Sequence, residues 1–232
     1  MASRPLYAPS DKFPFVIEKT IEFKWHAGLS VSQKQKSINA LHAEITGQGF
    51  GLKPLEVSSK SELDLGVALS AFNLLVSTEN GNRVAVENIF QAAKIFKQGG
   101  PYKDLLQVSP LDAKRDIRLK ESGDLTGFQG REYVWPLEPK TIFYDWIYIN
   151  ALYRDIPLAN KIMDYDSFTD IEFNPKKSFN CQARSVALFV ALRRTQQLAE
   201  IIGDPVSYRK LMLSDLDKFP SQYKIPVQQS LI

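Results

Sequence analysis

Residues 86–96 have the most distinctive pattern of apolar and polar positions in the chain. On a helix, which advances about 100° per residue, Glu87, Gln91 and Lys94 fall on one narrow stripe. The remaining circumference is apolar, at Val86, Ile89, Phe90, Ala93 and Phe96. The pattern predicts a largely buried helix, ended beyond Phe96 by Gly99-Gly100-Pro101, whose polar stripe faces either a strip of solvent or an internal cleft.

Other stretches predict further helices and a few short strands. Serine side chains accept hydrogen bonds from free N–H groups at helix starts, so Ser30 or Ser32 and also Ser109 are predicted N-caps. Alternation over residues 13–25 predicts one or two strands, and short strands are expected near residues 55 and 84. Residues 1–12 are expected to be loosely docked and residues 166–175 to form an irregular loop. Helices are expected over residues 28–42, 102–107, 140–154 and 181–202, the last being the longest.

These elements together predict an α+β fold, mostly helical, with a small β-sheet built from the N-terminal strands and the strands near residues 55 and 84. We expect an N-terminal strand and helix extension over residues 1–58, packed on a main domain over residues 59–232.

Composition narrows the class of protein. The 232 residues are 44% hydrophobic and 24% charged, which is typical of globular domains, and no run of 18 apolar residues predicts a membrane span. One cysteine, Cys181, cannot form an internal disulfide, and with only two histidines it argues against a His/Cys zinc site. We therefore expect a cytoplasmic protein with no metal and no cofactor. A net charge of +3 allows contact with nucleic acid but falls short of a dedicated DNA-binding surface.

Three polar groups are candidates for chemistry. The first is the Glu87, Gln91 and Lys94 stripe, which from spacing alone is also explained by an ordinary solvated face. The second is the loop over residues 167–172, with Asp170. The third is the basic segment over residues 174–184, where Lys176, Lys177, Arg184 and the N–H groups of a helix start suit an anion such as phosphate. Simple capping by Asn180 also explains this segment.

Residues 87–94, Glu-Asn-Ile-Phe-Gln-Ala-Ala-Lys, resemble the motif E-H-Y-F-Q-A-x-K of NADAR (YbiA-like) domains, with Asn88 in place of the histidine. Residues 68–74 resemble the F-S-x-F segment that precedes this motif in the family. Phe168 and Asp170 align with a W-x-D loop, and Asn180 with the asparagine of a G-K-N-x-L-G helix start. The similarity covers residues 60–202, departs from the family in Phe168 and in the missing glycines, and identifies residues 59–232 as a NADAR catalytic domain.

The N-terminal segment through residues 33–42 most resembles the NADAR branch associated with DarT-type DNA ADP-ribosyltransferase toxins. The resemblance implies an antitoxin of a toxin–antitoxin pair. The toxin attaches ADP-ribose to the exocyclic amino group of guanine in DNA, and the NADAR partner is an N-glycosyl hydrolase that removes it. Implied partners are therefore ADP-ribosylated guanosine DNA, with ADP-ribose as product, and the cognate DarT-type toxin, whose direct binding stays open.

Cleavage of an N-glycosidic bond passes through an oxocarbenium-like state, which a carboxylate stabilises while an acid assists the departing nitrogen. We assign Glu87 as base or electrostatic stabiliser and Asp170 as a second carboxylate. Lys94 either captures the anomeric carbon as a Schiff base or positions Glu87 or a phosphate. Expected substrate-binding residues are Ser70, Phe72, Asn73, Phe90, Gln91, Trp146, Asn180 and Arg184. Two alternatives remain: an N-glycosidase acting on a riboflavin-pathway intermediate, and a non-enzymatic antitoxin that binds its toxin.

Overall fold

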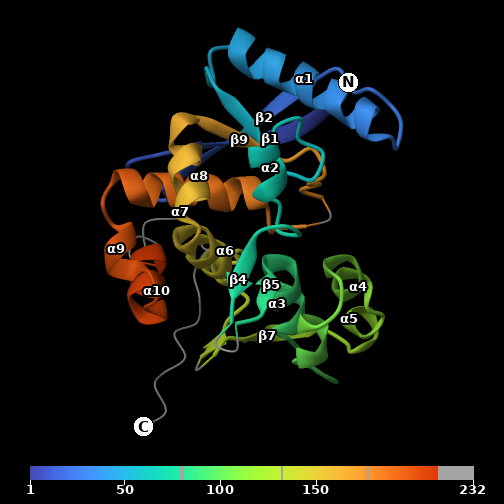
Figure 1. Ribbon diagram of the computed structural model, residues 1–232, viewed down its shortest axis with the longest axis vertical. Helices are drawn as coiled ribbons and strands as arrows, with labels where there is room; N and C mark the ends of the chain where they lie inside the picture. Colours follow the sequence, from blue (N-terminus) through green and yellow to red (C-terminus); the bar gives the residue numbers. More distant parts are fainter. Residues whose placement is uncertain (79–80, 132, 177, 214–232) are drawn as a thin grey trace.

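The computed structural model describes residues 1–78, 81–131, 133–176 and 178–213, so the end of the expected main domain, residues 214–232, lies outside the described residues. The predicted α+β class is confirmed (Figure 1). The helices are α1 (Val31–Gly47), α2 (Asp64–Ala68), α3 (Val86–Ala92), η1 (Lys103–Leu106), α4 (Pro110–Arg115), α5 (Arg118–Glu121), α6 (Ile142–Arg154), α7 (Ile156–Lys161), η2 (Ile162–Asp164), α8 (Gln182–Arg194), α9 (Leu198–Ile201) and α10 (Pro205–Leu213).

The largest sheet has four strands in the order β2-β1-β9-β3. Strand β1 (Ala2–Pro9) pairs antiparallel with β2 (Val16–Phe23) along its whole length and with β9 (Ser167–Thr169) on its other side. Strand β3 (Pro54–Glu56) pairs parallel with β9. The sheet therefore joins three segments that are distant in sequence.

Helices cover both faces of this sheet. Along β1, successive side chains point to opposite faces. Leu6 faces the cluster formed with α1, and Tyr7 faces the main core, in which α8 lies (Figure 1). Helix α1 begins at the N-cap Ser30, which confirms one of the two predicted serines, and buries Ile38, Leu41 and Ile45 on the sheet. The result is a three-layer arrangement of α1, sheet and α8.

Several expectations about the elements are wrong. The strand near residue 84 does not join the sheet of the N-terminal strands but pairs with residues 75–77 in a separate sheet. Residues 2–9 are not loosely docked but form the internal strand β1. Residues 167–169, expected in an irregular loop, form the fully buried strand β9. Helix α8 ends at Arg194, because Gln196 adopts a left-handed backbone with φ of 60° and starts a separate turn into α9. Among the described residues the longest helix is α1, with 17 residues against 13 in α8.

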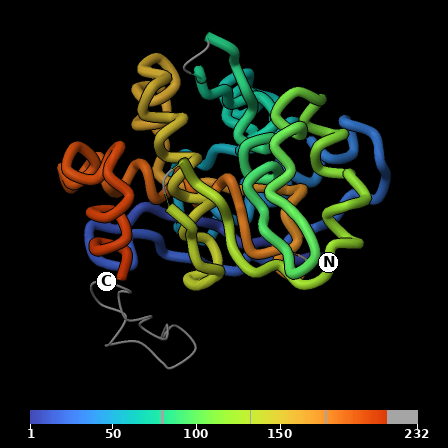
Figure 2. The backbone as a smooth tube through the Cα atoms, turned by 90° about the horizontal axis from the view of Figure 1, so that it is seen from below, coloured from blue at the N-terminus to red at the C-terminus, as the bar shows by residue number. Residues whose placement is uncertain are grey.

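The remaining strands form two small sheets around α3. Strands β4 (Leu75–Ser77) and β5 (Arg83–Ala85) make a hairpin that leads into α3, while β6 (Lys94–Phe96), β7 (Leu125–Gln129) and β8 (Val134–Trp135) follow it. Figures 1 and 2 both place α4 and α5 on the side of the molecule opposite α9 and α10. No helix within the described ranges has the length and hydropathy needed to cross a bilayer.

Candidate functional site

The start of α3 is held by the segment that resembles the family's F-S-x-F motif. The amide of Val86 donates to the carbonyl of Leu74, and the amide of Glu87 donates to the carbonyl of Ala71. These contacts satisfy two of the free N–H groups that every helix start presents. Ala71 is itself fixed, since its amide donates to Oε1 of Gln182 at 2.8 Å. The backbone of Glu87 is thereby tied, through Ala71, to α8.

The Glu87 and Gln91 side chains are buried, each 5% exposed, although both are polar. Gln91 Nε2 donates to Glu87 Oε1 at 2.9 Å. Gln91 Oε1 is buried and has no hydrogen-bond partner among the described residues. Lys114 Nζ, from α4, lies 3.8 Å from Glu87 Oε1 and 5.0 Å from the centre of the Phe72 ring. An oriented carboxylate, an open amide acceptor and an ammonium group thus meet at one place.

Lys94 is not on the helix, contrary to the expected stripe. Helix α3 ends at Ala92, and Lys94 is the first residue of β6, paired with Phe128 of β7. Strand pairing with distant residues overrides the local helical pattern. The ammonium still lies 4.9 Å from the centre of the Phe90 ring. Burial lowers the pKa of Lys94 to about 8; the charge of Glu87 opposes this shift and that of Lys114 adds to it.

Tyr144, on α6, is a candidate site residue that the sequence reasoning missed. Its ring meets Phe90 edge-on, with centroids 5.1 Å apart. Burial raises the pKa of Tyr144 well above its usual value, and the charge of Glu87 and, when it is ionised, that of Asp170 raise it further. The phenol therefore lies within electrostatic range of both candidate carboxylates and stays protonated. Lys114 was missed too, because the helical pattern of α4 marks it only as an exposed lysine.

Asp170 follows directly after β9 and is 6% exposed. Its Oδ1 accepts from the amides of Glu172 and Phe173 at 3.0 and 3.2 Å, and the Cys181 thiol lies 4.0 Å from Oδ2. Burial raises the pKa of Asp170 well above its usual value, and the neighbouring Glu56 raises it further. Asp170 is therefore a carboxyl group that tends to keep its proton.

Three further expected binding residues, Ser70, Phe72 and Asn73, belong to the loop before α3, and two of them line a cavity. Ser70 is buried, and Asn73 Nδ2 donates to the carbonyl of Val67 at 2.8 Å, so these two stabilise the loop before α3. Phe72 and Asn73 line a cavity of about 350 Å³ that reaches Asn88, Arg83 and Pro110. This cavity borders the start of α3.

The two aromatic residues that were expected to bind substrate at α3 and α6, Phe90 and Trp146, pack mainly in the protein core. Phe90 packs on Phe128 and Phe143 with ring centroids 5.3 and 6.5 Å apart. Trp146 lies between Trp135 and Tyr208, at 5.6 and 5.1 Å, so its stacking partners are the protein's own rings.

The basic segment before α8 presents fewer free groups than its sequence indicates. Arg184 turns inward and forms an ion pair with the buried Asp145, and its Nη1 also donates to Thr141 Oγ1 at 3.1 Å. Lys177 lies outside the described residues. Asn180 Oδ1 is buried and has no partner among the residues that the structure describes.

Asn88, which replaces the family's histidine, has a structural role. Its Nδ2 donates to the carbonyls of Leu105 and Val108 at 2.7 and 2.9 Å. These bonds hold the segment before α4 against α3. Ser109 then caps α4 as predicted, accepting from the amide of Asp112 at 3.1 Å. Asn88 therefore helps to place Lys114 beside Glu87.

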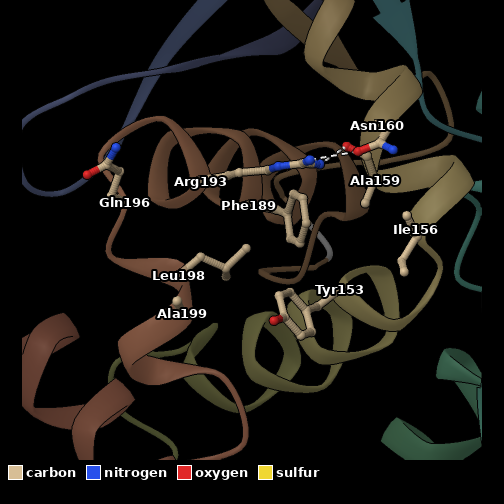
Figure 3. A pocket seen from close by; sticks show the side chains of 9 residues that line it. All are labelled: Tyr153, Ile156, Ala159, Asn160, Phe189, Arg193, Gln196, Leu198 and Ala199. Atoms are coloured by element: carbon tan, nitrogen blue, oxygen red, sulfur yellow. Dashed lines mark hydrogen bonds between the residues drawn. The ribbon is translucent and has the colours of Figure 1, made fainter.

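A larger cavity, of about 420 Å³, lies elsewhere, between α6, α7, α8 and α9 (Figure 3). Tyr153, Phe189 and Leu198 line it. Its one arginine, Arg193, is already bound to the carbonyl of Ala159 and to Asn160 Oδ1 at 2.6 Å. The candidate carboxylates Glu87 and Asp170 do not line this cavity, so the cavity is not part of the candidate catalytic site.

Comparison with known proteins gives a family for the chain. No curated protein sequence matches it. A sequence model of the DarT1-associated NADAR antitoxin family matches residues 2–220, nearly the whole length, and this agrees with the resemblance in residues 60–202 and 33–42. The chain belongs to the DarT1-associated NADAR antitoxin family.

Proposed function

We propose that this chain is an ADP-ribosyl glycohydrolase that removes ADP-ribose from the guanine amino group of DNA, and so reverses the modification made by a DarT-type toxin. The observation that carries the proposal is the buried Glu87 carboxylate, which Gln91 orients and near which Lys94 and Lys114 lie. Burying a carboxylate costs several kcal/mol unless it is well paired, so a polar group of this kind is typical of a catalytic site.

In the proposed reaction the bond between the anomeric carbon and the guanine amino nitrogen breaks, and its electron pair stays on nitrogen. A water oxygen bonds to the carbon and gives its proton to Glu87. The departing nitrogen takes a proton from an acid. Glu87 also stabilises the positive charge that develops on the sugar in the transition state. The free Gln91 Oε1 suits a ribose hydroxyl as donor.

Lys94 supplies a second route to the same products. A pKa near 8 leaves part of the amine unprotonated at neutral pH. The ribose can open to an imine, to which this amine adds at the anomeric carbon; the guanine amine is expelled and a Schiff base remains. Water then hydrolyses the Schiff base and releases ADP-ribose. Borohydride reduction during turnover traps this intermediate and distinguishes the two routes.

The test is release of ADP-ribose from an oligonucleotide modified on guanosine. We expect the native chain to release it and Glu87→Gln to lose at least about 100-fold in rate, the usual contribution of a general acid or base. Gln has the same size and its oxygen still accepts from Gln91, so the fold should persist. Glu22→Gln, on the exposed side of β2, is the matched control.

No release by the native chain would overturn the proposal. Protection of cells from the toxin by both the native chain and Glu87→Gln would instead favour a non-enzymatic antitoxin that binds the toxin.

A further inference from the structure

Glu56, at the end of β3, is a second buried carboxyl group that the reaction above does not use. It is 2% exposed and accepts three hydrogen bonds. Ser58 Oγ and the amide of Ile171 donate to Oε1 at 2.6 and 2.8 Å, and Thr169 Oγ1 donates to Oε2 at 2.7 Å. Glu56 therefore holds the residues on both sides of Asp170, one through its side chain and the other through its backbone.

The direction of the hydrogen bonds in this network is set by the protonation state of Glu56. When Glu56 is ionised, the Thr169 hydroxyl gives its one proton to Glu56, and His42 Nε2, at 2.8 Å from Thr169 Oγ1, is then the donor to that oxygen. Burial lowers the pKa of His42 to about 4, so the imidazole is neutral at neutral pH. The network thus supplies donors to Glu56 and no positive charge that would also stabilise an ionised Asp170.

The two carboxyl groups are not equivalent. Glu56 accepts from two hydroxyls and one amide at 2.6, 2.7 and 2.8 Å. Asp170 accepts from two amides on Oδ1 at 3.0 and 3.2 Å and, on Oδ2, only from the Cys181 thiol, a weaker donor, at 4.0 Å. Hydrogen bonds to a carboxylate stabilise its charged form. When only one of two neighbouring buried carboxyl groups ionises, the better solvated one takes the charge.

We propose that Glu56 is a positioning residue that carries the negative charge of this pair and leaves the proton on Asp170, so that Asp170 is the acid that protonates the departing guanine nitrogen. Only the role of Asp170 as the acid for the guanine nitrogen rests on the proposed function. As the glycosidic bond breaks, the Asp170 proton moves to nitrogen, and solvent then restores it.

The pKa shifts agree with this order. Burial raises the pKa of Glu56 to about 7, while its three donors lower it, so the first proton of the pair leaves near neutral pH. Burial raises the pKa of Asp170 well above its usual value, and the charge of Glu56 raises it too. The titratable or charged groups around the Asp170 loop are Glu56, Glu172, Cys181, Arg184, Tyr144, Tyr148, Tyr7, Arg4, Lys34 and His42.

The test is a pH titration of the side-chain carboxyl carbons by NMR on the full chain, with Asp170→Asn to assign the Asp170 signal. In the native chain we expect Glu56 to ionise before Asp170. In Glu56→Gln the Asp170 midpoint should fall by about one pKa unit or more, since a like charge is removed. Ionisation of Asp170 before Glu56, or an unchanged Asp170 midpoint, would overturn the proposal.

Ser58→Ala covers the case in which Glu56→Gln does not fold. It removes one donor and should raise the Glu56 midpoint, and a midpoint that stays constant would count against the proposal. Glu22→Gln should change neither midpoint.

The pH dependence of ADP-ribose release gives the catalytic readout. The alkaline limb should move to lower pH in Glu56→Gln, which a purely structural role would not produce, and a fixed limb would remove Asp170 as the acid. The carboxyl midpoints can behave as stated while the native chain releases no ADP-ribose. In that case the ionisation order of Glu56 and Asp170 is supported and the proposed function fails.

Discussion

Gln91 Nε2 donates a 2.9 Å hydrogen bond to Glu87 Oε1 one turn earlier on α3, and neither side chain is more than 5% exposed. The amide fixes the direction of the carboxylate. Its own oxygen is left without a partner among the described residues. Buried polar atoms in native proteins are normally satisfied, and we propose that a donor of the bound ligand satisfies this oxygen.

Gln91→Leu tests this relationship. The change removes the donor to Glu87, and hydrogen bonds to charged groups contribute about 1.5–3 kcal/mol, so we expect kcat/KM for ADP-ribose release to fall about 10-fold or more. The melting temperature should fall as well, because the buried carboxylate loses a donor, although removal of the unpaired amide oxygen offsets part of that loss. Gln98→Leu, at an exposed position, is the control. Equal activity in the two variants would show that Gln91 does not orient the carboxylate.

Lys94 should react with amine reagents at a lower pH than an ordinary lysine does. Its amine is unprotonated above a pKa of about 8, so reductive methylation followed by mass spectrometry should give a midpoint near that pH. The charge of Lys114 contributes to the shift, so Lys114→Gln should raise the Lys94 midpoint. A midpoint near 10.4, the usual lysine value, would contradict the burial of this group.

Asn88→Ala should destabilise the chain. Two hydrogen bonds to backbone carbonyls are lost and both carbonyls are left without this donor, so we expect a loss of about 2 kcal/mol in the free energy of unfolding, measured with denaturant. Asn39→Ala removes a single exposed contact to Glu62 and should cost less than about 0.5 kcal/mol. Similar losses in both variants would refute the structural role of Asn88.

Glu56 should make stability depend on pH. Its pKa is raised from 4.5 to about 7, so its contribution is complete below about pH 4.5 and is lost as pH rises through 7. The difference in unfolding free energy between the native chain and Glu56→Gln should therefore decline over this range, by an amount on the order of 3 kcal/mol. Denaturant curves at pH 5 and pH 8 measure it. A difference that grows with pH would show that Glu56 has a lowered pKa instead.

Sequence signals predicted correctly those features that depend on residues close together in the chain. The caps at Ser30 and Ser109 follow from nearby residues and are confirmed. Strand β9 was not recognised, because it has only three residues and pairs with partners more than a hundred residues away. Strand β1 was not recognised, because it contains Pro5 and Pro9, and proline is unusual inside a strand. Lys94 followed the helical pattern but was drawn into β6 by β7.

The site itself was visible in part. Glu87 and Gln91 were recognisable from their motif. The structure shows that both are buried on an otherwise apolar helix, where they are hydrogen-bonded to each other. Tyr144, Lys114 and Glu56 had no local signal: each is one polar residue in an ordinary helix or strand. Only the folded chain brings Lys114 beside Glu87, and Glu56 beside the residues that flank Asp170.

The position of β9 in the sheet sets the order in which the protein matures during synthesis. β1 and β2 can form a hairpin as soon as they leave the ribosome, but β1 and β3 each keep an open edge until residues 167–169 arrive between them. Asp170 comes directly after that strand. A nascent or truncated chain that stops short of it therefore has Glu87 but neither the second carboxyl group nor a closed sheet, and it exposes two strand edges that favour aggregation.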